Sequence, residues 1–500
     1  MKTLIISLLL FFTVNAQSIW YVNRDADGTD DGESWANACT TVTQVFTKAI
    51  TGGDSVYVSG GTDSTVYGGG GIYGGIFLND ERFDSYVIVT PAWESGHDGD
   101  VYFTTTGMSG DARALIETDN CKNIKFTGFY LRNLFTDGGE DTLTYFCLDQ
   151  NSRNLVYDNF NIYSWGQGFV FNILSDTSIT ISNNYYITAA TDYNQPTDPV
   201  YMSGGYGDHT ITGNTFIIKV AAEPGGEHAD FIQIGGGYEG GTGSDMPTMT
   251  IANNFFMFDP PTSTSTSGGI YLAWPRNINF LIYNNVFNVT QGSVQLLTMA
   301  QCGACDYTTL DATYNTNARV LNNTFITQDV ADTVYGMTWR YLDTLIIKNN
   351  IQYRAANGLH ALLNYKGEAN MDSVDIDYNT YYQIGNTPVM FDPDGTLDVY
   401  SWSEWQALGY DANSSYGIPT FTDWSSTTIS DYSVTSGDAR DGGIDISAEY
   451  PFLATDILGN ARSGSWDMGA LQFNGDSWLR SSNGRRIFSS DGKAIIMADE

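Results

Sequence analysis

The ten residues TMTIANNFFM (248–257) decide the fold, because close variants of this phrase recur along the chain. The other copies are SITISNNYYI (178–187), HTITGNTFII (209–218), INFLIYNNVF (278–287), ARVLNNTFI (318–326), LIIKNN (345–350) and SVDIDYNTYY (373–382). Aligning the second Asn of each copy gives the anchors Asn159, Asn184, Asn214, Asn254, Asn285, Asn323, Asn350 and Asn379. A repeat with a period of roughly 20–50 residues indicates a solenoid or another repeat architecture.

The repeat predicts parallel coils that stack one on another. We expect each unit to hold two strands, the first being the recurring phrase with Ile251 and Phe255 facing inward. Spacing between anchors ranges from 25 residues (Asn159 to Asn184) to 40 (Asn214 to Asn254), so the excess must leave as loops. The aligned asparagines then form a ladder of amide hydrogen bonds at a turn. A β-sandwich would not place Asn at the same point of every unit.

The amino-acid composition fits a repeat architecture, and the net charge restricts the possible binding partners. The chain has 500 residues with 42% hydrophobic content, 53 Gly and 32 Tyr, which favours many short strands and turns around a large core. A single repeat array can be this long. The net charge of −35 repels nucleic acid and anionic membranes. It also disfavours a polyanionic substrate, unless calcium or a local basic patch intervenes.

The first sixteen residues resemble a secretory signal. Lys2 precedes an apolar run from Leu4 to Val14, which is too short to span a bilayer, and Ala16 stands at a suitable cleavage point. No later stretch is apolar enough to span a membrane. We therefore expect a protein exported through a cleaved signal peptide, located outside the cell or at its surface.

Five segments follow from the repeat and the composition. We predict a signal peptide at 1–16, an N-terminal strand and cap with a short helix at 17–86, a parallel β-helix at 87–390, C-terminal coils and cap at 391–473, and a short β-meander tail at 474–500. The tail is basic, with Arg480, Arg485, Arg486 and Lys493. It is either a docking or sorting tag for a partner, or a plain C-terminal cap.

Three stretches resemble secreted right-handed parallel β-helix proteins of the pectin-lyase-like class. These are YVNRDADGTDDGESWANA with GGDSVYVSGGT near the start, the NNxF ladder, and SEWQALGYDANSS, SDYSVTSGDARDGG and TDILGNARSGSWDMGALQF near the end. The resemblance covers roughly residues 19–473 and implies an all-β, right-handed parallel β-helix. This class includes lyases, hydrolases, epimerases and non-enzymes, so the resemblance does not select a reaction.

The shorter second strand of each unit is predicted to carry one outward side chain. In stacking order these are Tyr201, Gln233, Tyr271, Gln295, Tyr335 and His360, with Trp274 and Trp339 just beyond. Aromatic faces beside amides suit sugar rings, which predicts a polysaccharide-binding groove. The alternative is ordinary, because tyrosine is common in strands. Arg276 is a further candidate contact. Lyases of the class that this chain resembles typically use Lys or Arg as the base, which makes Arg276, Arg340, Arg354 and Lys366 candidates, but these form no recognisable motif with the acidic residues.

The richest acid–base cluster is EPGGEHAD (223–230), which contains Glu227, His228 and Asp230. Asp198 occupies the equivalent of Asp230 one unit earlier, because TDPVYMSGGY aligns with ADFIQIGGGY. Two carboxylates about one rung apart repel each other, which raises the pKa of one or recruits a cation. His228 is a candidate general acid or base. We therefore predict Asp198, Glu227, His228 and Asp230 as catalytic residues. In the alternative, Asp230 caps a turn and His228 is solvated.

Two loops share the pattern D-x-D-G-x-x-D, with carboxylates at Asp25, Asp27 and Asp31 and at Asp392, Asp394 and Asp398. Such spacing suits a structural calcium ion or, alternatively, simple Asx turns. Nothing indicates a nucleotide or organic cofactor. Of the five cysteines, Cys302 and Cys305 favour a local disulfide, whereas Cys121 aligns with Ser152, so no bond to Cys147 is predicted.

Two functions fit these patterns. In the first, the chain binds an extracellular polysaccharide and cleaves or modifies it as a lyase, hydrolase or epimerase. In the second, it is a non-catalytic surface or adhesion solenoid that binds glycans or neighbouring proteins. The sequence does not select between them, nor does it identify the sugar, the linkage, the oligomeric state or the mode of anchoring.

Overall fold

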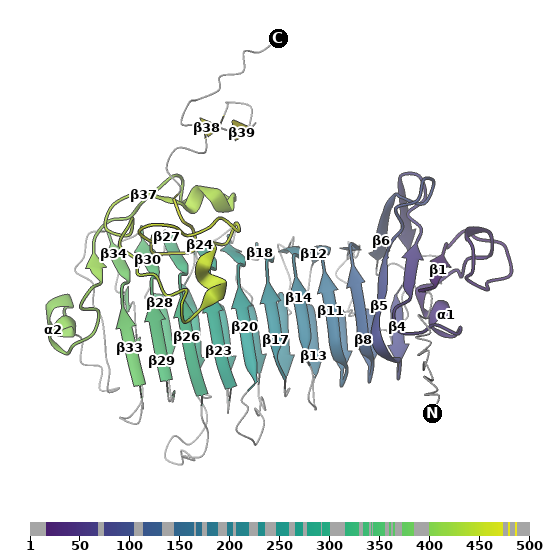
Figure 1. Cartoon of the computed structure of the whole chain (residues 1–500), viewed down its shortest axis with the longest axis horizontal. Helices are drawn as coiled ribbons and strands as arrows, with labels where there is room; N and C mark the ends of the chain where they lie inside the picture. The colour runs from purple at the N-terminus through teal and green to yellow at the C-terminus, as the bar shows by residue number, and fades with distance from the viewer. Residues whose placement is uncertain are drawn as a thin grey trace, which may run out of the picture.

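The computed structural model shows a long parallel β-helix built from three sheets (Figure 1). It describes residues 17–68, 75–104, 114–132, 145–164, 167–172, 178–188, 198–203, 207–219, 229–235, 247–259, 266–273, 278–291, 293–300, 316–329, 334–339, 342, 344–355, 360–361, 364–365, 373–384, 400–473, 479–480 and 486–487. The predicted all-β solenoid is confirmed. No described helix is long and apolar enough to cross a membrane.

The first sheet has twelve parallel strands. They are β1 (Ile19–Val22), β2 (Ser55–Val58), β5 (Arg82–Pro91), β8 (Lys122–Thr127), β11 (Arg153–Asp158), β14 (Ile179–Ser182), β17 (His209–Thr212), β20 (Thr248–Ala252), β23 (Ile278–Tyr283), β26 (Thr316–Leu321), β29 (Thr344–Lys348) and β33 (Ser373–Asp377).

The second sheet also has twelve strands, most of which follow the first-sheet strand of their own coil after a short corner. They are β3 (Ser64–Tyr67), β6 (Asp100–Thr104), β9 (Tyr130–Arg132), β12 (Asn161–Ser164), β15 (Tyr185–Thr188), β18 (Thr215–Ile218), β21 (Phe255–Phe258), β24 (Val286–Gln291), β27 (Thr324–Asp329), β30 (Ile351–Arg354), β34 (Thr380–Gln383) and β35 (Ser415–Tyr416).

The third sheet has eleven strands and closes each coil. They are β4 (Ile76–Asn79), β7 (Ala114–Asp119), β10 (Tyr145–Gln150), β13 (Gln167–Asn172), β16 (Val200–Ser203), β19 (Ala229–Gly235), β22 (Thr266–Ala273), β25 (Ser293–Ala300), β28 (Val334–Trp339), β31 (His360–Ala361) and β32 (Asn364–Tyr365).

Each coil therefore holds three strands, not the two expected. The recurring phrase is two strands, β20 and β21, separated by a corner at Asn253 and Asn254. Asn253 has a φ of 55°, the left-handed region that Asn tolerates better than most residues. This corner reverses the side on which the next residues lie. Ile251 faces the core as predicted, but Phe255 faces outward and Phe256 takes the inward position.

The predicted asparagine ladder exists and runs from Asn184 to Asn379. Each side-chain amide donates to the Oδ1 of the next member at 2.9–3.1 Å. Asn159 is not a member, because it occupies the left-handed corner position (φ 54°) and Phe160 stands where the ladder would continue. The register there is shifted by one residue from the sequence alignment.

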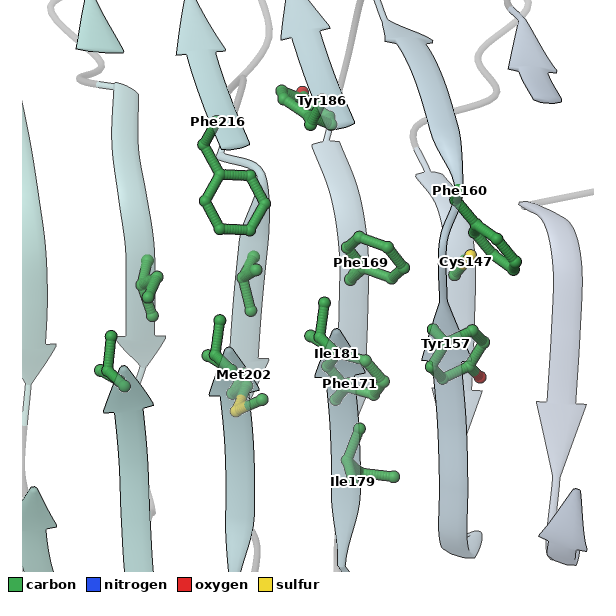
Figure 2. Packing of buried hydrophobic residues seen from close by; sticks show 14 of the residues in the cluster. Cys147, Tyr157, Phe160, Phe169, Phe171, Ile179, Ile181, Tyr186, Met202 and Phe216 are labelled. Atoms are coloured by element: carbon green, nitrogen blue, oxygen red, sulfur yellow. The ribbon is translucent and has the colours of Figure 1, made fainter. Parts of the chain in front are cut away.

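Inside the coils, apolar side chains from all three sheets form one continuous core from Val22 to Trp405. Figure 2 shows part of it, with Tyr157, Phe160, Phe169 and Phe171 packed in the interior. Further along, the rings of Phe256, Phe287 and Phe325 stack at 4.6 and 4.8 Å, close to the spacing of neighbouring strands. Like residues at like positions therefore extend the core by one layer per coil.

The N-terminal segment, residues 17–86, has little helix among its described residues. It contains a 3-10 turn (Trp35–Asn37) and a five-residue helix α1 (Val42–Phe46). Thr41 and Gln44 form a capping box that starts α1. The helix buries Val42, Val45 and Phe46 and contacts β1, β2 and β4, the first strands of the solenoid.

After β35 the chain turns back along the outside of the helix. We call residues 417–473 the C-terminal cover (Figure 1). It contains the antiparallel pair β36 (Thr420–Phe421) and β37 (Val434–Ser436) and 3-10 turns at Ile429–Tyr432 and Pro451–Ala454. The short helix α2 (Trp402–Ala407) precedes it. Beyond it, β38 (Leu479–Arg480) and β39 (Arg486–Ile487) form an antiparallel pair in the predicted tail.

Candidate functional site

Three of the predicted sugar contacts lie on neighbouring rungs of the third sheet. Tyr201 on β16 pairs in register with Gln233 on β19, which pairs with Tyr271 on β22. All three side chains are partly exposed, whereas their strand neighbours Met202, Ile232 and Leu272 are buried in the core. This follows from strand alternation. The row Tyr201–Gln233–Tyr271 therefore stands on the outer face, as the sequence predicted.

The rest of the predicted line does not continue this row. Thr298, and not Gln295, pairs with Tyr271. Gln295 pairs with Gly268 and Tyr335, which places these residues three positions earlier, in the row of Asp230. His360 pairs with Val334, one residue away from Tyr335. The predicted register was wrong here because β25 has eight residues, and its apolar residues can pair with the neighbouring strand in more than one register.

The two predicted stacked aspartates do lie on adjacent rungs. β16 and β19 pair with an offset of 32 residues, which places Asp198 opposite Asp230. The backbone N–H of Asp230 donates to Oδ1 of Asp198 at 2.7 Å. Both side chains are buried, with 0% and 1% exposure. A buried carboxylate is costly unless it is hydrogen-bonded or protonated. The Asp198–Asp230 pair is therefore an unusual acidic feature of the third sheet.

The remaining predicted site residues are only partly placed. Backbone positions are described for Tyr335 and His360, but not their side chains. Glu227, His228, Trp274 and Arg276 lie outside the described residues, as do Cys302 and Cys305. Cys39, Cys121 and Cys147 are buried free thiols, and the Cys121 N–H donates to Ser152, the residue with which the repeats align it.

The first predicted calcium loop does not gather its carboxylates. Asp25 forms an ion pair with Arg24 at 3.0 Å, and Asp31 accepts from Thr29 Oγ1 and from the Glu33 N–H. These turn bonds lower the pKa of Asp31, the Glu33 N–H contributing most. Among the described residues, no three His, Cys, Asp or Glu side chains are placed to hold a metal ion. Asp392, Asp394 and Asp398 lie outside them, so calcium there stays a prediction.

A buried carboxyl group that the sequence did not indicate lies inside the helix. Asp149 on β10 occupies the same inward row as Phe171 and Met202. It accepts from Thr118 Oγ1 at 2.7 Å, and that hydroxyl lies 3.4 Å from the Tyr157 hydroxyl. Burial raises the pKa of Asp149 to about 6. Only the strand register reveals it, because a lone aspartate in a strand usually faces water.

Comparison with known proteins identifies no family and no activity for this chain. No protein-family model and no curated protein matches the sequence. Among solved structures, the chain is similar to one titled "Crystal structure of pectate lyase Pel9A". The identity is 12%, the match covers 92% of this chain and 97% of that one, and the TM-score is 0.35. The parallel β-helix architecture of this chain rests on its own three sheets, and a likeness at this identity and TM-score carries no argument about class or activity.

Chemically, the third sheet combines a buried acidic pair with an outward row on the same strands. Asp198 lies two residues before β16, which carries Tyr201, and Asp230 and Gln233 both lie on β19. Neighbouring strands of a sheet lie about 4.8 Å apart, so both features repeat at the spacing of one rung. The outward row can hold a polymer against the sheet, while the two carboxyl groups three residues upstream are buried.

Proposed function

We propose that this chain is an exported β-helix protein that binds an extracellular polysaccharide on the outer face of the third sheet and cleaves or modifies it there. The observation that supports the proposal best is the Asp198–Asp230 stack, whose two members lie three residues before Tyr201 and Gln233. Ring faces and an amide suit sugar rings and their hydroxyls. The acidic pair supplies groups able to move a proton.

Within this proposal the two carboxyl groups have different roles. Asp198 accepts the Asp230 N–H, and such a bond stabilises the negative charge on Asp198. Two close carboxyl groups would resist double ionisation, and the proposal therefore assigns the proton of the pair to Asp230. Asp230 then acts as the general acid toward a glycosidic or ring oxygen, with Asp198 as the anion beside it. Glu227 and His228 complete the proposed set as further proton carriers.

The test is a panel of polysaccharides incubated with the secreted protein, read by absorbance of unsaturated products and by new reducing ends. On a cleaved substrate, Asp230→Asn is expected to lower kcat/KM by about 10²-fold or more, the usual share of a general acid. Tyr271→Ala should raise KM chiefly. Asp84→Asn, an exposed carboxylate on β5 of the first sheet, is the matched control and should keep wild-type activity.

The outcomes separate the two functions. Full activity in both Asp230→Asn and His228→Ala would show that the acidic site is wrong. Binding to a polysaccharide without any product would favour the non-catalytic adhesion solenoid, in which the third-sheet row only holds the glycan. Absence of both binding and product across the panel would contradict the proposal as a whole.

A further inference from the structure

The outer face of the second sheet is covered along only part of its length. Toward the C-terminal end, the cover packs on it through Phe421, Tyr432 and Leu471, which bury apolar residues of several neighbouring coils. Those sheet residues are Ile217, Phe255, Met257, Val286, Ile326, Ile351 and Tyr353. Polar contacts fix the cover in place, among them Asn349 Nδ2 to the Ile444 carbonyl at 2.8 Å and Ala470 N–H to Thr324 Oγ1 at 3.0 Å.

Toward the N-terminal end, the same face continues without the cover, which lies over the opposite end of the helix (Figure 1). Strand pairing defines two outward rows here. The first is Val66, Tyr102, Tyr130, Asn161, Tyr185 and Thr215; the second is Arg132, Tyr163 and Ile187. We call Tyr102, Tyr130, Arg132, Tyr163 and Tyr185 the tyrosine face.

The tyrosine face is exposed and partly pre-ordered. Tyr163 and Tyr185 have 51% and 42% exposure, high for side chains of this size on a sheet. At one end, the rings of Tyr102 and Tyr130 lie 4.7 Å apart, and the guanidinium of Arg132 stacks over Tyr102 at 4.3 Å. The Tyr102 hydroxyl donates to Asp100 at 3.1 Å. These contacts fix aromatic and polar groups before any ligand arrives, which lowers the entropic cost of binding.

Composition changes where the cover ends. Covered positions are mostly aliphatic, as suits a permanent protein contact, and Ile187 lies at the edge of that cluster. The positions beyond it in the same rows are four tyrosines with Val66, Asn161, Arg132 and Thr215 among them. A tyrosine presents an apolar ring and a hydroxyl that prefers water or a hydrogen-bond partner. The uncovered part therefore fits a ligand that offers both CH faces and hydroxyls. When such a ligand dissociates, the tyrosine hydroxyls can bond to water instead.

We propose that the tyrosine face is a second binding site, separate from the third-sheet site, for a neutral polysaccharide chain lying along the axis of the helix. Successive rungs lie about 4.8 Å apart, so an extended chain would meet a new outward side chain at each coil. The net charge of −35 selects against polyanionic chains, and Arg132 is the one cation among the five residues of the face. Binding here would hold the protein on its polymer whether or not the third sheet cleaves it.

Affinity measurements on the full secreted protein test this site. Depletion assays with microcrystalline cellulose, insoluble xylan and insoluble mannan present neutral chains, and affinity electrophoresis in polygalacturonate presents an anionic one. Wild type should bind at least one neutral polymer. The double variant Tyr163→Ala/Tyr185→Ala should bind it about tenfold more weakly, as expected when aromatic anchors are truncated.

A matched variant and a parallel measurement make the result specific. Tyr86→Ala removes a tyrosine of similar exposure (41%) from β5 in the first sheet and should leave binding unchanged. Turnover by the double variant is measured in parallel on a soluble polysaccharide that wild type cleaves, so a failure of the third-sheet proposal stays distinguishable from a failure of this one. Thermal unfolding of each variant shows whether it is folded, and the exposed positions of Tyr163 and Tyr185 predict little change.

Four results would overturn the proposal. They are no binding to any neutral polymer, binding to polygalacturonate alone, equal binding by the double variant and wild type, and a wild-type dimer that the double variant converts to a monomer. The last would show that the face contacts a second copy of the chain.

Discussion

Asn285→Ala is expected to destabilise the protein by about 3–5 kcal/mol, because it interrupts the asparagine ladder at its centre. Asn285 is fully buried. Its Oδ1 accepts the backbone and side-chain N–H groups of Asn254 at 2.9 and 3.0 Å, and its Nδ2 donates to the Ile251 carbonyl and to Asn323 at 2.8 and 2.9 Å. Alanine would leave the buried backbone N–H of Asn254 without this acceptor, and would remove one hydrogen bond each from the side chains of Asn254 and Asn323 and from the Ile251 carbonyl. Urea unfolding followed by circular dichroism measures the loss.

Asn317→Ala is the matched control. Its side chain lies on the first sheet, is partly exposed and donates to Asn279 at 3.0 Å. The expected loss is below about 1 kcal/mol, as for most partly exposed sites. Equal losses from both substitutions would show that the ladder is no special source of stability and that any asparagine contact between coils contributes as much.

Asp149→Asn is expected to stabilise the protein at pH 8 relative to wild type, and the advantage should shrink as the pH falls to 4. Burial raises the pKa of Asp149 from 3.8 in the unfolded chain to about 6 in the fold. The folded state therefore holds the proton more tightly, and stability falls as the pH rises from about 4 through 6. The difference amounts to up to about 3 kcal/mol. Unfolding of both proteins across this pH range measures it.

Comparing variant with wild type at each pH is necessary because another buried group acts in the opposite direction. Burial lowers the pKa of His209 to about 4, so acidification from pH 6.5 to 4 costs stability through this residue. The term is common to both proteins and cancels in their difference. A stability difference that does not change with pH would contradict the assignment to Asp149.

Asp411 provides a contrast. Burial raises its pKa to about 6 as well, but it accepts from Trp405 Nε1 at 2.8 Å, Asn379 Nδ2 at 3.1 Å, the Tyr381 hydroxyl at 3.0 Å and the Ser414 hydroxyl. An amide cannot satisfy so many donors. Asp411→Asn should therefore lower stability at pH 8 by about 1–3 kcal/mol.

The β-helix fold could be predicted because the same residue pattern recurs in successive coils. Asn254 and its equivalents satisfy the same backbone groups in every coil, so the same residue type recurs and marks the register. The phrase did not reveal the corner within it. Thr248–Ala252 and Phe255–Phe258 both have the composition of strands, and only the left-handed φ of Asn253 separates them. With the corner missed, Phe255 was assigned to the core.

Features that depend on contacts between distant parts of the chain could not be predicted from the repeat pattern. The cover buries outward residues such as Phe255 and Ile351, which look like core residues in the sequence. Asp198 and Asp230 could be paired because their strands share the motif of a short apolar run followed by glycines. The register between Tyr271 and Gln295 could not be predicted, because the eight residues of β25 can pair with β22 in more than one register. The tyrosine face was missed because two strands were predicted for each coil, so the second-sheet strands were not recognised as having an outer face of their own.

The two-residue corner also determines where the chain can grow. Ladder members are 27 to 40 residues apart in sequence, yet they meet at hydrogen-bonding distance in every coil. Length differences between coils must therefore fall in the other two connections, which lead into and out of the third sheet. Segments inserted there leave the stacking order untouched. New loops can therefore be added beside the proposed acidic site without changing how the coils stack on one another.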